Sequence, residues 1–542
     1  MSILPGEKLR YAETHFKFKL PWSLLYRPWP EIFTDAPFQF VPGVAPILWI
    51  GVRDGDRFPA TIESVELSIK KVDDGLGCAQ AEKCTPEVRT FGDLNLPAKN
   101  AFDFFPIEIG NLAPGRYEIT SKVTATRNGK KKVFKRWNFP GLKSAPLKIQ
   151  VLAEKLPMAS GFVAGEMHCH TRYSADHVEY GASPAVMQQA AKAVGLDFVN
   201  FTDHAYDFAF LQEDYTQEAP SAPARFQELK QEIAALPQSP LLIAGEEVSA
   251  GNTKGENVHM TVLGPEGYLP GLGDCGRYWL SNRPTLPIER LLEMAGAPCF
   301  AAHPLQQMGM LEKFIFRRGF WKNADLHLND SKNPIRGIQF WNGIRDEGFK
   351  LGRDWWIEEL GKGNYLLPIG GNDAHGDLND TTFVEQPLFS LGHNRNHVFG
   401  KVRTAVFVGE NLPDFRHPEQ GAVGTAAKDP DLYSISQEAL KRAFTGDNCY
   451  VTDGPALWWE RSGAAIVFHA QSNNEMGGGF RYIRIYGRRR GAKEEVVLPE
   501  SLVAASQNET ITVQAAGYAY LRAECETATG RFALTSAAAI TA

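Results

Sequence analysis

The segment GEMHCHTRYSADH, residues 165–177, decides how the centre of this chain folds and what it can bind. Its first half is predicted to end a β-strand, in which side chains two residues apart point to the same face. His168 and His170 can therefore reach one metal ion, while Cys169 between them points the other way and is expected to be buried. Asp176 follows His170 closely and adds a carboxylate near the same strand end.

Four further groups of histidines and acids follow, each beside the end of a strand-like apolar run. They are Asp203 with His204, Glu247 with His259, His303 before Pro304, and Asp373 with His375. The last pair repeats the same-face spacing of the first segment. Because strand ends that are followed by helices converge on the active face of α/β sheets and barrels, we expect these groups to form a single site.

Around these groups, from about residue 158 to 415, strand-like runs alternate with candidate helices. The clearest candidate has Ser183 as N-cap, Pro184 in the first turn and Gly195 after the last turn. Further candidates are PARFQELKQEIAALP (223–237), IERLLEMAG (288–296) and RDWWIEELGKG (353–363). This alternation is typical of βα units around parallel strands, arranged as a barrel or an open sheet. We therefore predict an α/β domain over 158–415.

The two flanking parts, residues 1–157 and 416–542, are dominated by short strand-like runs. In the first part, alternation in EITSKVTAT (118–126) leads into Asn128–Gly129, a pattern typical of a hairpin turn. In the second part, strands return after one helix-like segment, ISQEALKRAFTG. We predict a β-sandwich-like domain at each end, with linkers at 158–162 and 416–430.

The composition is that of a globular protein of several domains. The 542 residues predict two to four domains, and 43% hydrophobic with 22% charged residues argues against disorder. A net charge of −6 argues against a dedicated nucleic-acid scaffold. Seven cysteines suit a reducing compartment, and neither a signal peptide nor a membrane span is recognisable. We expect a cytoplasmic protein that acts on a small molecule, without a membrane partner; a homo-oligomer is compatible with the sequence.

Imidazoles and carboxylates without clustered thiolates predict a site for zinc, manganese or iron. The candidate ligands are His168, His170, Asp176, His204, Glu247, His259, His303, Asp373 and His375. One ion cannot use all of them, so two or three divalent ions are expected, with Glu247 as the natural bridge. A single histidine at a strand end is more often a polar surface or core residue, but that explanation is poor for several such groups in this order.

The same segments resemble, in order, the PHP (polymerase and histidinol phosphatase) superfamily over about 165–376. The matching motifs are GEMHCHTRYSADH, FTDHAYDF, AGEEVS with ENVHM, FAAHPL and GGNDAHG. More loosely, QFWNG and the later VRTAVFV and ALKRAFTGDNCYVTDGP resemble the branch that includes carbaryl-type hydrolases. The resemblance implies a distorted (β/α)7 barrel, flanked here by the two β-sandwich-like domains, with two or three metal ions at the C-terminal ends of its strands.

Carried over motif by motif, the resemblance distributes the ligands over three ions. It assigns His168, His170, Glu247 and Asp373 to one ion, Glu247, His259 and His303 to a second, and Asp176, His204 and His375 to a third. Glu247 is chosen over Glu246 because the family pattern is Gly, any residue, Glu. Glu246 should then face the opposite side of the strand.

Three residues are candidates for contacts with the substrate or for catalysis. Arg172 could bind a phosphate or carboxylate with two hydrogen bonds, or form a salt bridge that stabilises its loop. His177, beside Asp176, could donate a proton or face solvent. Asp203, adjacent to His204, is expected to orient an imidazole.

These residues predict a hydrolase that uses a metal-activated hydroxide. The GxSxG motif of serine hydrolases, the P-loop and the GxGxxG fingerprint are missing from the sequence. The favoured activity is that of a phosphoesterase on a small phosphomonoester or phosphodiester, because Arg172 suits a phosphate. The alternative is an ester, carbamate or amide hydrolase of the carbaryl-hydrolase type. A third interpretation, an inactive metal- or glycan-binding scaffold, fits the nearly full ligand set poorly.

Overall fold

The computed structural model describes most of the chain. The described residues are 8–10, 29–72, 85–138, 142–174, 181–209, 218–274, 282–309, 313–314, 316–328, 334–376, 378–385, 390–409 and 435–541. Strands dominate, and they are organised in several sheets. Among the helices within these ranges, none has the length and apolar composition needed to cross a bilayer.

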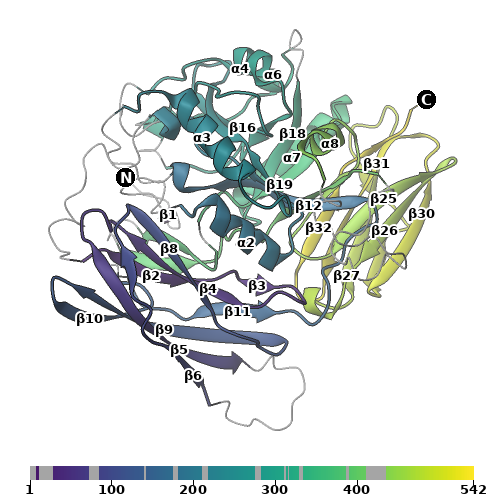
Figure 1. Cartoon of the computed structure of the whole chain (residues 1–542). Helices are drawn as coiled ribbons and strands as arrows, with labels where there is room; N and C mark the ends of the chain where they lie inside the picture. The colour runs from purple at the N-terminus through teal and green to yellow at the C-terminus, as the bar shows by residue number, and fades with distance from the viewer. Residues whose placement is uncertain are drawn as a thin grey trace, which may run out of the picture.

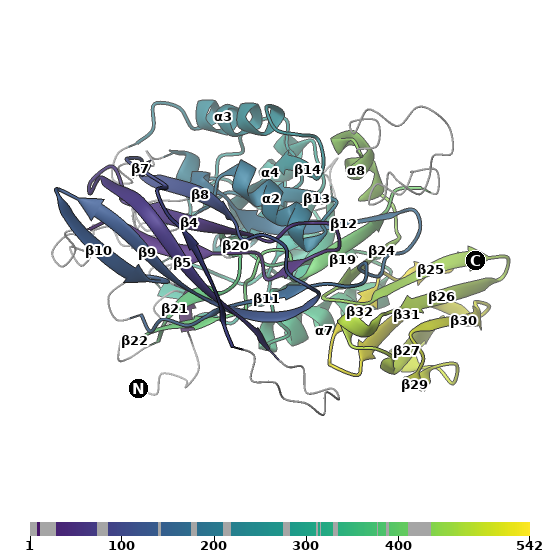
Figure 2. The ribbon, with the colours of Figure 1, turned by 60° about the horizontal axis from the view of Figure 1, so that its bottom comes forward.

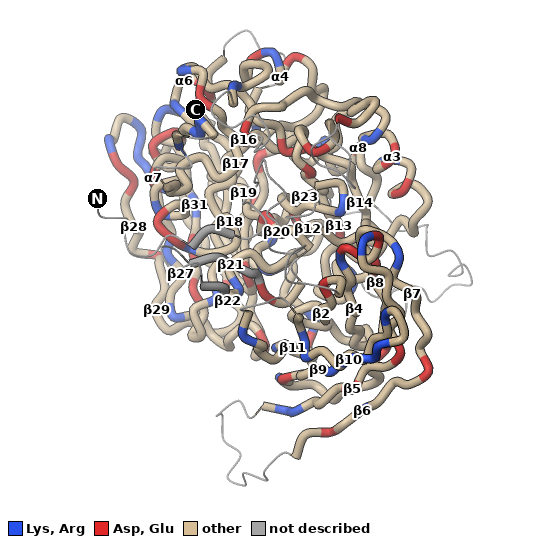
Figure 3. The backbone as a smooth tube through the Cα atoms, turned by 90° about the vertical axis from the view of Figure 1, so that its left-hand side faces the viewer, with Lys and Arg blue, Asp and Glu red and all other residues tan. Residues whose placement is uncertain are grey.

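The N-terminal strands, the helix-containing central part and the C-terminal strands occupy different regions of the molecule (Figure 1). A rotated view separates the N-terminal and C-terminal strands on two sides of the central helices (Figure 2). Lys and Arg are interspersed with Asp and Glu along the backbone (Figure 3), as expected for a chain with 57 basic and 63 acidic residues.

The N-terminal part contains two main sheets that share one core. The larger sheet consists of β3 (Gln39–Phe40), β5 (Ala60–Val72), β6 (Glu87–Phe91), β7 (Leu96–Ala98), β9 (Gly115–Arg127), β10 (Lys130–Lys135) and β11 (Leu147–Val151). The smaller sheet consists of β2 (Glu31–Asp35), β4 (Ile47–Arg53) and β8 (Phe102–Glu108). Ile50 of the smaller sheet and Leu67 of the larger belong to the same buried cluster. The predicted turn is confirmed, since Asn128 and Gly129 have φ of 49° and 70° and join β9 to β10.

A short sheet joins the N-terminal end of the chain to the central part. It consists of β1 (Lys8–Arg10), β21 (Thr381–Glu385) and β22 (Ser390–Asn394), all antiparallel. Next to β21, Asp380 accepts a hydrogen bond from Arg136 at 2.8 Å, and both side chains are buried. Residues Lys8–Arg10 are thus tied to the central part by backbone pairing, and the segment after β10 is tied to it by the buried ion pair of Arg136 with Asp380.

The central part contains βα units with parallel strands, as predicted. β12 (Phe162–His170), β13 (Phe198–Phe201) and β14 (Leu241–Ala244) pair in parallel, connected by α2 (Pro184–Val194) and α3 (Ala222–Ala234). β17 (Cys299–Ala302), β18 (Ile335–Asn342) and β19 (Leu367–Gly371) are also parallel, with α6 (Asn323–Leu326) and α7 (Glu347–Lys362) between them. The antiparallel pair β15 (Glu246–Gly251) and β16 (Asn257–Val262) precedes α4 (Ile288–Ala295).

The predicted helix boundaries of α2 are confirmed and have local causes. The Ser183 side chain accepts a hydrogen bond from the backbone N–H of Val186, and Pro184 occupies the first turn. Gly195 ends the helix with a φ of 81°, a left-handed conformation that glycine adopts without a steric penalty. α7 begins six residues before the predicted segment, because the Asp346 side chain caps it by accepting from Phe349 N.

Within the described residues, the central strands pair as two sheets and not as one closed seven-stranded barrel. The first sheet contains β14, β13 and β12, and the second runs in the order β15, β16, β17, β18, β19. The two sheets meet on both sides of the site. On one side His204 forms a β-bridge with Glu247, and on the other the two-residue strand β20 (Ala374–His375) pairs with the end of β12.

The C-terminal part continues the first central sheet. β23 (Arg403–Phe407) pairs with β12 and with β24 (Cys449–Thr452), which pairs with β32 (Phe532–Thr535). The sheet extends through β31 (Tyr518–Thr527), β27 (Phe480–Arg489), β28 (Val496–Val497), β29 (Leu502–Ala505) and β33 (Ala538–Ala539). A second sheet of β25 (Ala456–Ser462), β26 (Ala465–Gln471) and β30 (Asn508–Gln514) packs on it, and α8 (Gln437–Ala443) lies between β23 and β24 in the chain. The predicted linker 416–430 lies outside the described residues.

Candidate metal centre

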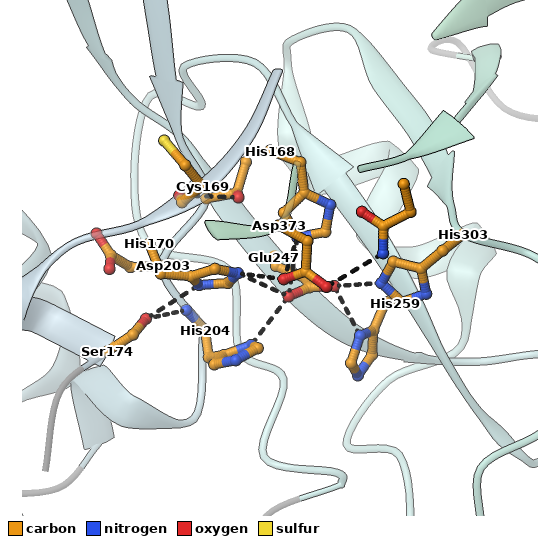
Figure 4. Close-up of polar contacts among 12 residues, drawn as sticks. His168, Cys169, His170, Ser174, Asp203, His204, Glu247, His259, His303 and Asp373 are labelled. Atoms are coloured by element: carbon orange, nitrogen blue, oxygen red, sulfur yellow. Dashed lines mark hydrogen bonds and ion pairs between the residues drawn. The ribbon is translucent and has the colours of Figure 1, made fainter. Parts of the chain in front are cut away.

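The end of β12 and two acids from other strands form the first group of candidate ligands. His168 and His170 are fully buried, and their Nε2 atoms face Glu247 Oε2 at 3.2 and 3.5 Å. The same atoms face Asp373 Oδ1 at 3.6 and 3.2 Å. One ligand atom from each of the four residues lies within 4.8 Å of the others, a spacing that a shared cation requires (Figure 4).

A second group lies on the other side of Glu247. Its Oε1 atom is 2.6 Å from His259 Nδ1 and 3.0 Å from His303 Nε2. Figure 4 shows His259 and His303 on one side of Glu247, and His170 and His204 on the other. Since each carboxylate oxygen faces a different set of imidazoles, Glu247 has the geometry of a bridging ligand.

The third group consists of His170, His204 and His375. The Nε2 atoms of His204 and His375 are 3.4 Å apart, and the rings of His170 and His375 stack with centroids 4.0 Å apart. Asp176, which the sequence placed in this group, lies outside the described residues, as does the predicted proton donor His177.

Outer hydrogen bonds fix the orientation of two imidazoles. His168 Nδ1 is 2.8 Å from Gln339 Oε1, and His259 Nε2 is 2.7 Å from Asp274 Oδ2. Bonds of this kind leave the opposite ring nitrogen directed at the centre. The sequence reasoning missed both partners, because a strand glutamine and an acid 15 residues beyond His259 carry no ligand pattern of their own.

Two of the ligands have a backbone conformation that non-glycine residues rarely adopt. The φ angles are 51° for Asp373 and 27° for His303. Such conformations cost about 1–3 kcal/mol and persist where surrounding contacts enforce them. Asp373 is held by its backbone N–H, which donates to His168 O at 2.6 Å, and by Asn342 Nδ2, which donates to its Oδ2 at 3.2 Å.

The adjacent acids Glu246 and Glu247 have opposite environments. Glu246 Oε2 accepts a hydrogen bond from Leu269 N at 2.8 Å, and burial raises the pKa of Glu246 well above its usual value. Burial acts in the same direction on Glu247, but the neighbouring His259 and His168 outweigh it and hold the pKa of Glu247 well below its usual value. Of these two acids, Glu247 is the one that faces the imidazoles, as expected from the sequence. The expected burial of Cys169 is also confirmed.

The imidazoles of the metal-free chain differ strongly in basicity. Burial opposes the charged form of His168, but Glu247 and Asp373 outweigh it and raise the pKa of His168 to about 9. In the same way, Glu247 and Asp274 outweigh burial and raise the pKa of His259 to about 10. Burial and the nearby His170 lower the pKa of His204 to about 3. Cations that bind here would displace protons from His168 and His259, so metal affinity should rise with pH.

Arg172 and Asp203 contact neighbouring loop and helix residues. Arg172 Nη2 is 2.8 Å from Glu232 Oε2 on α3, which corresponds to the salt-bridge alternative. Asp203 accepts hydrogen bonds from Thr171 N at 2.7 Å and Thr171 Oγ1 at 2.8 Å, and these bonds hold the turn after β12. In that turn, Ser174 Oγ lies 3.3 Å from His170 Nδ1, so Asp203 supports the imidazole through the turn and not by direct contact.

The donor atoms at the centre fit divalent metal ions. His168 Nε2, Glu247 Oε2 and His259 Nδ1 are buried, and their ion-pair contacts around Glu247 lack the geometry of a hydrogen bond. A cation between the carboxylate and the imidazoles would be coordinated by all three atoms. The eight ligands within the described residues are nitrogen and oxygen donors, a set that suits zinc, manganese or iron.

A pocket opens beside the second group. Its lining consists of Asn257, Val258, His259, Ala302, His303, Pro304, Gln306, Met308, Arg318, Gly319 and Trp321. His259 and His303 therefore belong both to the pocket wall and to the ligands around Glu247. The pocket is small, with a volume of about 30 Å³, and reaches the side of the centre formed by His259 and His303.

Comparisons with known proteins do not place the chain in a family. No protein-family model matches it, and no curated protein matches it. Two crystal structures of a β-glucuronidase from Parabacteroides merdae, one with glycerol in its active site, are similar at 8% sequence identity. The matches cover 94% and 93% of this chain and 77% and 76% of the glucuronidase, with TM-scores of 0.18 and 0.17. Similarity at this level supports no conclusion about fold or function.

Proposed function

We propose that this protein is a metal-dependent hydrolase, most simply a phosphoesterase acting on a small phosphomonoester or phosphodiester. The observation that carries the proposal is the convergence of eight buried or partly buried ligands on Glu247 and Asp373. They are His168, His170, His204, Glu247, His259, His303, Asp373 and His375. Convergence of this kind is hard to explain by packing, because buried ionisable groups are costly without a partner.

The charge of the ligand set favours a phosphoester as substrate. Only Glu247 and Asp373 are anionic among the eight ligands. Two or three divalent ions would therefore leave the centre with an excess of about two to four positive charges, if the imidazoles are neutral ligands. A phosphate group, with its negative oxygens, complements such a centre.

In this proposal the chain's own residues hold, orient and separate the reacting groups. Bound metal ions would lower the pKa of a water ligand and polarise a phosphoryl oxygen. Glu247 would be a ligand in two of the groups, because its two oxygens face different imidazoles. Gln339 and Asp274 keep His168 and His259 directed at the centre. Burial of the first and third groups excludes bulk water from these two sides.

We further propose that the central part is a PHP-type barrel, distorted into the two sheets described above. Two contacts around the site support this arrangement, namely the bridge between His204 and Glu247 and the pairing of β20 with β12. The parts on either side, 1–157 and 416–542, would then be β-sandwich-like domains attached to the barrel.

A second candidate activity is hydrolysis of an ester, carbamate or amide carbonyl at the same centre. The observation that favours it is the pairing of both nearby arginines with carboxylates, Arg172 with Glu232 and Arg318 with Asp274. A dianionic phosphate usually recruits cations beyond the metal ions, and these two are already engaged.

Metal content and substrate preference, measured together, test the proposal. Protein purified without chelator should contain two or three divalent ions and release phosphate or nitrophenol from p-nitrophenyl phosphate or bis-p-nitrophenyl phosphate, with loss of activity in EDTA. Asp373→Ala and His168→Ala should lose both metal and activity. His327→Ala is the control, because His327 pairs with Glu359 away from the centre and should retain both.

Other outcomes would overturn part or all of the proposal. Cleavage of p-nitrophenyl acetate alone, with metal bound, would establish the carbonyl hydrolase in place of the phosphoesterase. Metal-free protein that stays inactive after addition of manganese, zinc or iron would favour the scaffold. Full metal content in Asp373→Ala and His168→Ala would show that the ligand assignment is wrong.

A further inference from the structure

The segment QFWNG (339–343), at the end of β18, contacts the candidate ligands without supplying one. β18 pairs in parallel with β17 and β19, and His303 and Asp373 follow the ends of these two strands. We propose that Gln339 and Asn342 are positioning residues for the metal centre. Their side-chain amides form a directional chain of hydrogen bonds from Asp373 to His168. The inference rests on the metal centre of the proposed function and adds how ligands from different strands are held in a fixed relation.

A local irregularity in β18 lets both amides reach the centre. In a regular strand, side chains three residues apart point to opposite faces. The pairing of β18 with β19 shifts register between Gln339 and Trp341. Phe340 and Trp341 both contact Phe349 of α7, with ring centroids 5.7 and 5.5 Å away. Two consecutive side chains thus pack against the helix, which leaves Gln339 and Asn342 on the side of the ligands.

The hydrogen bonds of the chain run in one direction, starting from a carboxylate. An ionised carboxylate can only accept, so Asn342 presents its Nδ2 to Asp373 Oδ2, at 3.2 Å. Asn342 Oδ1 is then left to accept from Gln339 Nε2, at 3.3 Å. Gln339 Oε1 is in turn left to accept from His168 Nδ1, at 2.8 Å. The proton of a neutral His168 is thereby placed on Nδ1, and the lone pair of Nε2 is directed at Glu247 and Asp373, where a cation would bind.

A branch of the chain reaches the loop after β17. Asn342 Nδ2 also donates to Gln306 Oε1 at 3.4 Å, and Gln306 N donates to His303 O at 3.1 Å. The amides of β18 therefore support ligands that lie on, or directly follow, three different strands. Because Gln339 is fully buried, a partner lost from this chain would not be replaced by bulk water.

The affinity of the protein for zinc, measured by competition with a chelator at one pH, tests the chain. Gln339→Met, of similar size, removes the acceptor for His168 and should weaken zinc binding about 10–100-fold, as for other outer partners of ligands. Gln339→Glu retains an oxygen for His168 Nδ1 and should keep the affinity of the parent or exceed it. Gln188→Met is the matched control, because Gln188 is a buried glutamine of α2 whose Nε2 bonds Pro237 O and Pro240 O, away from the ligands.

A second substitution tests whether the two amides act as one chain. Asn342→Leu should weaken zinc binding although Asn342 does not touch His168, and the half-buried end of the strand should tolerate the change in shape. In the double variant, Gln339→Met with Asn342→Leu, the loss should be smaller than the product of the two single losses, because both changes break the same chain. If Gln339→Met does not fold, Asn342→Leu alone and in the Gln339→Glu background decides the question: the loss should be smaller in that background, where the carboxylate fixes His168 by itself.

The outcomes separate failure of this inference from failure of the proposed function. Zinc binding by the parent, with unchanged affinity in Gln339→Met and Asn342→Leu, would overturn the inference and leave the metal-dependent hydrolase intact. Equal losses in Gln339→Met and Gln339→Glu would show that the shape of the side chain matters and not its acceptor oxygen. Losses that multiply in the double variant would show that the two amides act independently. A parent protein that binds no zinc, manganese or iron would overturn the proposed function and this inference with it.

Discussion

Replacement of Glu166 by glutamine tests how the metal centre is held in place. Glu166 is fully buried on β12, the strand that also carries His168 and His170, and is not itself among the candidate ligands. Its Oε1 accepts from His168 N at 3.1 Å and from Asn372 N at 2.9 Å. Its Oε2 accepts from Asn372 Nδ2 and from Gly400 N, the latter at 2.9 Å. The carboxylate thus ties the backbone of one ligand, His168, to the residue before another, Asp373.

The expected loss follows from these four hydrogen bonds. An amide has one acceptor oxygen, so either orientation of the introduced glutamine side chain would set its NH2 group against two buried donors. Each buried donor left without a partner costs about 1–3 kcal/mol, so with two such donors we expect Glu166→Gln to lower the free energy of unfolding by about 2–6 kcal/mol. Displacement of His168 and Asp373 should also weaken metal binding by about 10–100-fold, as for other outer partners of ligands.

Urea unfolding of metal-free protein and a competition titration with a metal chelator measure the two effects. Burial raises the pKa of Glu166 to about 7, so the comparison should be made near pH 8, where the carboxylate is ionised. Glu246→Gln is the matched control. Glu246 is equally buried but accepts one hydrogen bond among the described residues, from Leu269 N. The single acceptor oxygen of glutamine can keep that bond, so the substitution should cost less than about 1 kcal/mol.

Two results would refute this reasoning. If the free energy of unfolding of Glu166→Gln were within about 0.5 kcal/mol of the parent value, the four hydrogen bonds would not hold His168 and Asn372 in place as described. If Glu246→Gln were as damaging as Glu166→Gln, general sensitivity to glutamine at buried acids would explain the loss, and the specific link to His168 and Asp373 would be wrong.

Three further predictions concern separate features of the molecule. Asp274→Asn should lower metal affinity about 10–100-fold, because the amide no longer fixes His259 as the carboxylate does; a chelator titration that finds no change would contradict this. Glu247→Gln should remove at least one bound ion by elemental analysis, because it takes the shared anion from two ligand groups. Burial opposes ionisation of Asp380, but contacts with His393 and Arg136 outweigh it and lower the pKa of Asp380 from 3.8 to about 2. The ionised Asp380 should therefore add about 2 kcal/mol to the free energy of unfolding above pH 4, and this contribution should be lost as the pH falls toward 2. In urea unfolding, Asp380→Asn should be less stable than the parent at pH 7 and indistinguishable from it near pH 2.

Local periodicity was enough to predict several parts of the fold. The same-face spacing of His168 and His170 on a strand depends only on the two-residue repeat of β structure, and both side chains point to the centre. The ends of α2 depend on Ser183 and Gly195, which act within one helical turn. The turn at Asn128–Gly129 likewise depends on the conformations that these two residues allow.

Contacts between distant strands could not be predicted in the same way. Gln339 and Asp274 orient two imidazoles only because β18 and the loop after β16 lie beside the ligands, and neither position has a periodic signal. The pairing of Arg172 with Glu232 depends on where α3 packs, 60 residues away. The continuation of the central sheet into the C-terminal strands through β23 and β24 also joins parts that the composition predicted as separate domains.

The sequence by itself therefore predicted the candidate ligands and their place in a central α/β region. The prediction that each group ends a strand is wrong for Glu247, which lies at the start of β15, and for His259, which lies within β16. Strand periodicity and the chemistry of imidazole and carboxylate act within a few residues, and both are visible in the chain. Only the tertiary structure decided that the two oxygens of Glu247 face five imidazoles, that the central strands pair as two sheets, and that a partly apolar pocket opens at His259 and His303. These features depend on the register and packing of strands far apart in sequence, where many arrangements satisfy the same local pattern and the burial of the whole core selects one.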